Sequence, residues 1–431
     1  MTAMHLQSSE RAAHSQLTKQ QILGFWFAWA GWTLDGMDSF IYAMVLAPAL
    51  RDLLPRSGYR ADAATVGAAG SVLFALFLVG WGFSFVWGPI ADRYGRTRAL
   101  AASVLVYSLF TGAAAFSHNV WQLAVFRLLA GVGIGGEWAM AGTYVAEVWP
   151  EDRRVRGAGY LQTGYYAGFF LAAALNYTIG ARFGWRAMFF CGFVPVIVSL
   201  LIATKLKEPE RWSGKHAIDS GSRLIAIFKG PYRKRTLVNS GLLTIAIIGL
   251  WAGAVFEPTA ITILAGHEGI NSVGAARLAS LGTAFLSVGT ILGCLAMPIL
   301  AERFGRKPAL SIYFAGMAFS IALTFGWAFY LPHGLRVFIG MLFLLGFFGG
   351  NFAIFSLWIP EQYETKVRAT AFAFTTSVGR FVGAAANFII AALVHRMGTL
   401  GWPIAFTSAA FVAGLLLIPL AIETKNCRLP D

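Results

Sequence analysis

The stretch PIADRYGRTRAL (residues 89–100) decides the fold, because it occurs a second time as PILAERFGRKPAL (residues 298–310). Its acidic residue Asp92 has a counterpart in Glu302, 210 positions further along the chain. The other repeated pairs are AEVWPEDRRVRG (146–157) with LWIPEQYETKVRA (357–369) and NYTIGARFGW (176–185) with NFIIAALVHRMGTLGW (387–402). Three motif pairs in the same order and at nearly one offset indicate two homologous halves.

Composition places these halves in a membrane. The chain has 431 residues, 57% of them hydrophobic and only 13% charged, with a mean hydropathy of +0.64. Soluble domains carry about 25% charged residues, and apolar runs long enough to span a bilayer recur throughout the chain. We therefore predict an all-α integral membrane protein of twelve transmembrane helices in two six-helix halves. The predicted spans are 22–48, 64–91, 99–118, 121–147, 158–180, 186–205, 237–262, 276–301, 308–331, 335–359, 369–394 and 403–423.

The net charge of +14 would suit a nucleic-acid partner, but its distribution argues against one. Most of the 34 Lys and Arg residues fall in loops on the side of the N-terminus. Because basic loops mark the cytoplasmic side, we expect both termini to be cytoplasmic. The expected organisation is a cytoplasmic tail (1–21), an N-terminal half (22–205), a basic cytoplasmic connector (206–236), a C-terminal half (237–423) and a second tail (424–431).

Cysteine and histidine usage narrows the function classes. Cys191 and Cys294 fall inside predicted spans and Cys427 in the tail, so no disulfide framework is expected. All seven histidines fall in loops or tails, which argues against a membrane haem or metal enzyme. The polar N-terminal segment has no short apolar core, so we expect no cleaved signal peptide.

Parallel halves of six spans are typical of secondary transporters that hold substrate near the membrane midplane. GPIADRYGRTRAL (88–100) and RLLAGVGIGG (127–136) resemble signatures of the major facilitator superfamily, and the resemblance extends over essentially the whole chain. GGEWAMAGTYVAEVWPEDRRVRGAGYL (135–161) and GWRAMFFCGFVPVI (184–197) resemble its sialate and lactate proton-symporter branch, and LDGMD (34–38) resembles aromatic-acid proton symporters. The resemblance implies symport of an organic anion with protons.

Two carboxylates interrupt the first predicted span, AGWTLDGMDSFIYAMVLAP (30–48). Asp35 and Asp38 are three residues apart and therefore share one helix face. A charge at the bilayer centre costs roughly 2.5–3.5 kcal/mol on insertion scales, and two neighbouring carboxylates in a low dielectric cannot both ionise easily. We expect at least one of them to bind a proton for coupling. The alternative is a packing pair satisfied by neighbouring polar groups.

Arg127 in the fourth span lies at nearly the same predicted depth as Asp38, within reach of its side chain. A pair that forms and separates during the cycle would release Asp38 to bind a proton, and the family resemblance supports it. A permanent structural salt bridge is the alternative. The glycines after Arg127 are expected to pack helices closely rather than to bind a nucleotide, because GVGIGG (131–136) does not follow a strand.

Two more acids, Glu137 and Glu257, lie inside predicted spans. Glu137 lies near the depth of Asp35 and is predicted to be a second proton site, a partner for substrate hydroxyls, or a structural hydrogen-bonding group. Glu257 lies about five residues from the outer end of the seventh span, and an acid at the interface needs no functional explanation.

Arg380 lies near the centre of the eleventh predicted span, and we expect it to be the one positive charge deep within the membrane in the second half. A guanidinium that faces a cavity would bind a carboxylate through two parallel hydrogen bonds. The alternative is an arginine tied to backbone carbonyls or to Glu257. The polar residues expected to orient the substrate, each of which could instead form an interhelical hydrogen bond, are Gln162, Tyr165, Tyr166, Asn351 and Asn387.

Charged residues at the cytoplasmic ends of the helices are predicted to form a gate. Opposite charges there could close the inner side, provided that each pair is weak enough to break, as exposed pairs are. The alternative is that the arginines only set topology. The predicted gate residues are Asp92, Arg96, Glu147, Arg153, Arg156, Glu302, Arg306 and Arg368.

We therefore predict a secondary active transporter rather than an enzyme, which moves a small organic carboxylate together with protons by alternating access. It needs no cofactor or metal besides the coupling proton. Its partners are the organic anion and the lipid bilayer, and we expect a monomer in the plasma (inner) membrane. A proton-coupled sugar symporter of the same superfamily is the first alternative. A nutrient sensor or a channel is the second, although a connector of about 30 residues is too short for a sensor's output domain.

Overall fold

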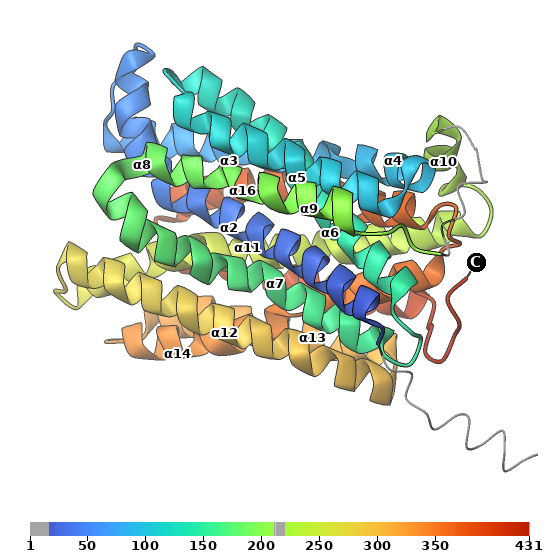
Figure 1. Ribbon diagram of the computed structural model, residues 1–431. Coiled ribbons are helices and arrows are strands. Elements are labelled where there is room, and N and C mark those ends of the chain that lie inside the picture. Colours follow the sequence, from blue (N-terminus) through green and yellow to red (C-terminus); the bar gives the residue numbers. More distant parts are fainter. Residues whose placement is uncertain (1–16, 211, 213–219, 431) are drawn as a thin grey trace, which may run out of the picture.

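The computed structural model describes residues 17–210, 212 and 220–430, and every regular element in that part of the chain is a helix. The long helices run along one common direction (Figure 1). The described ends of the chain lie together at one end of the bundle, which we call the terminal face; the other end is the opposite face.

The N-terminal half contains eight α-helices. They are α2 (Lys19–Arg56), α3 (Ala63–Phe83), α4 (Trp87–Tyr94), α5 (Arg96–Ala113), α6 (Val120–Val148), α7 (Arg154–Leu175), α8 (Ala181–Phe190) and α9 (Pro195–Lys205). Polar residues begin several of them, because a side-chain oxygen can accept from an otherwise unpaired backbone N–H. Thr18 forms a capping box with Gln21 at the start of α2, and Asn119 caps α6. Pro195 begins α9, where a missing N–H costs nothing.

The rest of the chain continues with nine α-helices. They are α10 (Ser220–Ala226), α11 (Tyr232–His267), α12 (Ser272–Phe304), α13 (Arg306–Ile321), α14 (Leu335–Gly349), α15 (Phe352–Trp358), α16 (Arg368–Met397), α17 (Gly401–Ala405) and α18 (Ser408–Leu417). Short 3-10 and π segments join several of these to their neighbours.

The predicted fold class is confirmed. Each predicted span lies on one helix or on two or more consecutive helices, and within the described residues nine candidate spans are long and apolar enough to cross a bilayer. Some boundaries differ from the prediction. Helix α2 continues to Arg56, well past the predicted end at residue 48, and α11 already begins at Tyr232 inside the predicted connector. The connector contains α10; its residues 211 and 213–219, like most of the predicted N-terminal tail, lie outside the described residues.

Glycines let the helices of the N-terminal half approach closely. A Cβ at Gly36 of α2 would meet the backbone carbonyl of Tyr165 on α7, and one at Gly131 of α6 would meet that of Phe77 on α3. Only a residue without a side chain fits these crossings, as in other close contacts between membrane helices. The expected packing role of the glycines after Arg127 therefore agrees with the structure.

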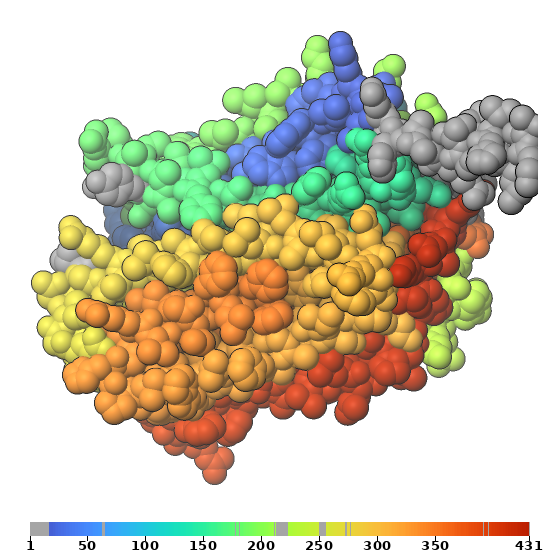
Figure 2. All heavy atoms as spheres, turned by 90° about the horizontal axis from the view of Figure 1, so that it is seen from below, coloured from blue at the N-terminus to red at the C-terminus, as the bar shows by residue number. Residues whose placement is uncertain are grey.

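The two halves lie side by side. Figure 2 shows the blue-to-green N-terminal half beside the yellow-to-red C-terminal half. Helix α16 packs against α3, α4 and α6, while α12 packs against α7. Arg380 on α16 lies at this boundary, because its guanidinium contacts Trp81 and Trp138 of the N-terminal half.

Candidate functional site

A cavity of about 730 Å³ lies between the halves in the part of the bundle nearer the opposite face. On α2 it is lined by residues 39–50, in the portion of the helix away from the terminal face, and on α12 by residues 279–287. Most of its wall is apolar and includes Phe40, Phe74, Phe77, Phe169, Phe256 and Phe388. Its polar groups are few, among them Ser39, Tyr42, Tyr165, Ser287 and Asn387.

Two carboxyls lie between this cavity and the terminal face. Asp35 precedes Ser39, the first cavity-lining residue of α2, by one helical turn, and the Glu137 carboxyl lies beside a still earlier part of α2. Asp35 and Glu137 are fully buried, and neither carboxyl has a hydrogen-bond partner among the described residues. The Glu137 carboxyl lies against Gly31 of α2, where a Cβ would collide with it. The two carboxyls interact electrostatically with each other, so the predicted proximity of Asp35 to Glu137 is present in the structure. Unpaired buried acids of this kind suit proton binding, although the role itself stays a prediction.

The structure also brings Asp38 and Arg127 together. The Arg127 Nη1 lies 3.8 Å from the Asp38 Oδ2, and both side chains are fully buried. This separation is too long for a hydrogen bond, and the guanidinium has no hydrogen-bond partner among the described residues. It lies instead over the rings of Tyr42, at 3.9 Å from the centroid, and Phe77, at 4.4 Å. Such a loose pair fits the interpretation of a partnership that can separate better than that of a fixed bridge.

Arg380 on α16 faces the N-terminal half. Its guanidinium lies 4.0 Å from the ring centroid of Trp81 and 5.8 Å from that of Trp138. It interacts electrostatically with Tyr165 and Asp35. One nitrogen donates to the carbonyl of Thr376, but Nε has no partner in the described part of the chain. Part of its hydrogen-bonding capacity is therefore free.

Glu257 is not the partner of Arg380. Its carboxyl accepts a hydrogen bond from Thr283 Oγ1 at 3.0 Å, and α11 continues ten residues beyond it to His267. Glu257 is 1% exposed. Glu257 therefore lies in the protein interior on a helix that extends beyond the apolar run from which its end was judged, and its position at the membrane interface stays a prediction.

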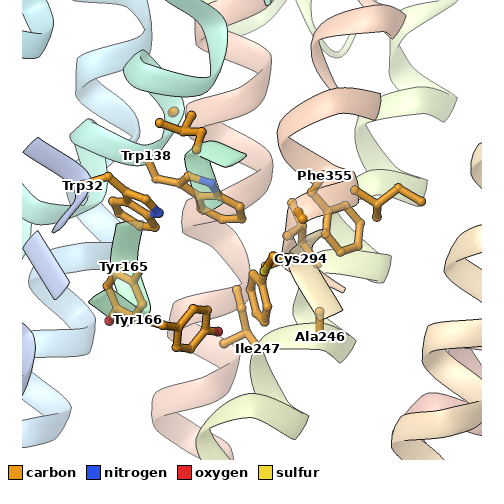
Figure 3. Close-up of a cluster of buried hydrophobic side chains, with 14 of the residues drawn as sticks. Trp32, Trp138, Tyr165, Tyr166, Ala246, Ile247, Cys294 and Phe355 are labelled. Atoms are coloured by element: carbon orange, nitrogen blue, oxygen red, sulfur yellow. The ribbon is translucent and has the colours of Figure 1, made fainter. Parts of the chain in front are cut away.

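A layer of aromatic rings separates the cavity from the terminal face. Trp32 stacks on Trp138 at 5.9 Å, and Tyr165 lies 4.7 Å from Trp32. Figure 3 shows these three rings on one side of the cluster, with residues of the C-terminal half on the other: Ala246, Ile247, Cys294 and Phe355.

One hydrogen-bonded bridge joins the halves within this layer. Trp138 Nε1 donates to Ser356 Oγ at 2.9 Å, and that hydroxyl lies 3.5 Å from Gln162 Oε1. Gln162 and Ser356 are both nearly fully buried. Gln162 thus faces the boundary between the halves, as expected of an orienting residue, while its partner Ser356 was not anticipated.

The other predicted orienting residues are more scattered. Tyr165 lines the cavity, and its hydroxyl has no partner among the described residues. Asn387 also lines the cavity, but its side-chain amide donates a hydrogen bond to the Gly383 carbonyl. Tyr166 is buried within the aromatic layer. Asn351, at the junction of α14 and α15, donates to the Phe348 carbonyl and does not line the cavity.

The terminal face is closed by two buried ion-pair clusters. In the first, Arg96 binds both oxygens of Glu147, at 3.0 and 3.1 Å, and Arg368 from the other half donates to the same carboxylate at 2.7 Å. In the second, Arg306 binds both oxygens of Glu361, at 2.8 and 3.0 Å. The partner from the other half is Arg154, at 3.2 Å. The clusters repeat the internal duplication, since each acid joins its own half to the opposite one.

Asp92 adds a further connection between the halves. It pairs with Arg96 at 2.8 Å and accepts hydrogen bonds from the backbone N–H groups of Ala369 and Thr370 at the start of α16. A carboxylate at a helix N-terminus is favoured by the helix dipole. We call the set Asp92, Arg96, Glu147, Arg154, Arg306, Glu361 and Arg368 the terminal-face gate.

Two gate predictions need correction. The central pairs are buried, not exposed, so that each is harder to break than a surface pair. Arg153 precedes α7, and among the described residues its ion pair is with its neighbour Asp152 at 4.0 Å, not with the other half. Arg156 and Glu302 join the halves at 3.8 Å as an exposed pair, which agrees with the prediction.

No described group of three His, Cys, Asp or Glu side chains is arranged to hold a metal ion. The described polar groups at the centre are a guanidinium, carboxyls and hydroxyls surrounded by indole and phenol rings. This arrangement can bind an anion and protons, and it offers nothing that resembles a catalytic nucleophile with its base.

Comparison with known proteins agrees with this geometry. Residues 28–301 match the family model described as Major Facilitator Superfamily, and residues 244–428 match that of Sugar (and other) transporter. The chain belongs to the major facilitator superfamily. It is 28% identical to a probable 4-methylmuconolactone transporter of Cupriavidus pinatubonensis, over 96% of this chain and 93% of that protein. It is 26% identical to a sialic acid transporter of Escherichia coli, over 94% and 95% of the two chains.

Among solved structures, that of the proton:xylose symporter XylE has a TM-score of 0.79 at 17% identity and covers 95% of this chain and 98% of its own. This likeness shows the fold. As a member of this superfamily the protein is a multi-pass membrane transporter and not an enzyme, as the sequence predicted.

Proposed function

We propose that this transporter is a proton-coupled symporter of small organic carboxylates. The observation that carries the proposal is Arg380, a buried guanidinium between the halves with unused hydrogen-bonding capacity and an aromatic ring beneath it. A carboxylate is the ligand that best matches a guanidinium, through two parallel charge-assisted hydrogen bonds. The relatives named for 4-methylmuconolactone and sialic acid support an organic acid as the substrate.

The rings around Arg380 favour a flat substrate. Trp81 and Trp138 lie beside the guanidinium, and Trp32 and Tyr165 complete the aromatic surroundings. An unsaturated or aromatic acid could stack on such rings, and each offset-stacked or edge-to-face pair contributes about 0.5–1.5 kcal/mol beyond the burial of its area. We therefore infer that planar carboxylates bind more tightly than branched aliphatic ones of equal size.

The position of Asp35 suggests how proton and substrate are coupled. Ionised Asp35 and a substrate carboxylate would both be stabilised by the positive charge of Arg380. When the substrate carboxylate binds Arg380, the ionised form of Asp35 loses part of that stabilisation, so protonation of Asp35 becomes more favourable. The neighbouring Glu137 carboxyl acts in the same sense, since two adjacent acids disfavour a second negative charge. Anion and proton binding would then reinforce each other, as symport requires.

Alternating access follows from the two ends of the bundle. The cavity lies toward the opposite face while the terminal-face gate is closed, which we interpret as one of the two states of the cycle. In the other state the two ion-pair clusters would separate as the halves rock. We further propose that the protein lies in the plasma (inner) membrane as a monomer, with both termini cytoplasmic, because the basic loops lie at the terminal face.

A sugar symporter is the alternative that the match to the sugar-transporter family model raises. Sugar hydroxyls need many convergent hydrogen-bonding groups, whereas this cavity is lined mainly by phenylalanine and aliphatic side chains. A sugar would also leave Arg380 without a negatively charged partner. We therefore favour the organic acid.

Substitution at Arg380 tests the anion site. In Arg380→Gln, benzoate binding measured by calorimetry should weaken about 100-fold, because the lost contact is charge-assisted and buried. Arg380→Lys keeps the charge but not the paired geometry and should fall between the two. Arg277→Gln, a change at an exposed position on α12, should bind like the unmodified protein. Unchanged benzoate affinity in Arg380→Gln would refute the assignment, and preferential binding of glucose would favour the sugar symporter.

A further inference from the structure

A buried acid of the C-terminal half lies outside the cluster described above. Glu257 on α11 is 1% exposed, and its carboxyl lies against α12, where a Cβ on Gly282 would come within 3.0 Å of its Oε1. The absence of a side chain at Gly282 thus leaves room for the carboxyl. Thr283 next to it donates a hydrogen bond to Glu257 Oε1 at 3.0 Å.

The Thr283 hydroxyl can serve both charge states of the acid. It lies 3.1 Å from the carbonyl of Ala279 as well as 3.0 Å from Glu257, but a hydroxyl has only one hydrogen to donate. When that hydrogen points to Glu257, the carboxylate is ionised and receives a hydrogen bond. When it points to Ala279, the hydroxyl oxygen is free to accept from a protonated Glu257. Rotation about one bond therefore accommodates the gain or loss of a proton.

Among the described residues, no charged group interacts with Glu257 to hold it in one state. Among the described residues of α11 and the helices packed against it, α12, α14, α16 and α18, Thr283 is the one polar group that interacts with the carboxyl. A proton from the cavity has a short path to Glu257, because its neighbours Phe256 and Pro258 and its partner Thr283 line the cavity. The acid is thus covered by residues that themselves face the cavity.

We propose that Glu257 and Thr283 form a proton-binding site on the cavity wall, separate from Asp35, Asp38 and Glu137, that controls entry of the anionic substrate. A proton from the water in the cavity binds Glu257 and leaves the wall neutral, so that an anion can pass. Loss of that proton places a negative charge beside the entry path and repels the anion. The control of anion entry rests on the proposed carboxylate function, whereas the proton-binding site itself does not.

The size of the cavity sets the expected effect. A volume of 730 Å³ corresponds to a width of about 9 Å, and Coulomb's law at that separation gives roughly a 2- to 20-fold change in anion affinity for effective dielectric constants of about 80 to 20. Substrate affinity should therefore fall by this factor as the cavity-side pH rises through the titration of Glu257.

Infrared spectroscopy tests the proton site without any substrate. The purified protein in nanodiscs should show a protonated-carboxyl C=O band that disappears as the pH is raised and is absent in Glu257→Gln. Thr283→Val keeps the acid but removes its partner, so the band should move to higher frequency, whereas Thr283→Ser should leave it in place. Thr283→Val reports on the site even if Glu257→Gln does not fold. Identical spectra in all variants would overturn the proposal.

Benzoate exchange between proteoliposomes and medium tests the effect on entry. With rising pH, the KM of the unmodified protein should rise 2- to 20-fold more than that of Glu257→Gln, while both still accumulate benzoate in response to a pH gradient. An equal rise of KM in both proteins would overturn the entry role. A titrating Glu257 band in a protein that does not exchange benzoate would contradict the proposed function but not the proton site.

Discussion

Removing the charge of Glu147 should open the terminal face. Glu147 is the acid of the first buried cluster, where it holds Arg96 of its own half and Arg368 of the other. Glu147→Gln keeps the size of the side chain but removes the carboxylate that links Arg96 to Arg368, while Arg96 keeps its pair with Asp92. The side chains of all three residues are fully buried, so water cannot replace the lost partner.

The burial of the cluster sets the magnitude. Breaking a buried ion pair by removing one partner costs about 3–5 kcal/mol. Because the pair between Glu147 and Arg368 exists only when the halves are closed at the terminal face, that cost falls on the closed state. A loss of about 3 kcal/mol changes the ratio of closed to open molecules by a factor on the order of 100. We therefore expect the open state to become well populated in Glu147→Gln.

Distances between spin labels measure this ratio. Labels at Tyr94 on α4 and Phe304 on α12 occupy exposed positions near the terminal face, one in each half. The unmodified protein should give one main short distance, and Glu147→Gln should add a longer one.

An exposed pair provides the matched control. Arg156 and Glu302 also join the halves, at 3.8 Å, but their side chains are 59% and 37% exposed, and exposed pairs contribute about 0–1 kcal/mol. Glu302→Gln should therefore leave the distance distribution nearly unchanged. An unshifted distribution in Glu147→Gln, or an equal shift in both variants, would refute the conclusion that burial makes the gate.

Three further substitutions have defined outcomes. Ser356→Ala removes the acceptor of Trp138 and should lower the free energy of unfolding by about 1–3 kcal/mol in chemical denaturation; no change would mean that the bridge contributes nothing. Gly36→Ala should cost about 1–3 kcal/mol or abolish expression, whereas Gly67→Ala, with open space around it, should be tolerated, and equal behaviour would contradict the close crossing of α2 and α7. Partial burial opposes ionisation of Glu423, but hydrogen bonds from four backbone N–H groups outweigh it and hold the pKa of its carboxyl below the usual value. Glu423 therefore stabilises the fold above its ordinary pKa and loses this contribution as the pH falls through the lowered value, so Glu423→Gln should reduce the melting temperature at neutral pH and less in acid.

The sequence was sufficient for the fold and for part of the centre. Runs of apolar residues are long enough to mark the spans, and the repeated motifs reveal the duplication. Depth along a helix can be counted at 1.5 Å per residue, which is why the approach of Asp38 to Arg127 could be predicted.

Rotation and pairing of helices could not be predicted in the same way. Adjacent helical residues point about 100° apart, so the choice between Arg153 and Arg154 as the gate residue depends on how α7 is rotated. The surroundings of Arg380 depend on which helices of the two halves pack together. Counting depth along the helices of one half does not reveal this packing. Trp81 and Asp35 therefore replace Glu257 as its neighbours.

Uptake of benzoate into proteoliposomes under an imposed pH gradient, with the membrane potential clamped at zero, tests the proposed symport most directly. If one proton accompanies one monocarboxylate, the cycle is electroneutral and accumulation should rise about tenfold for each unit of pH difference. Arg380→Gln should abolish this uptake. Accumulation that follows membrane potential at a constant pH gradient, or benzoate flux that does not saturate, would contradict electroneutral symport at this site.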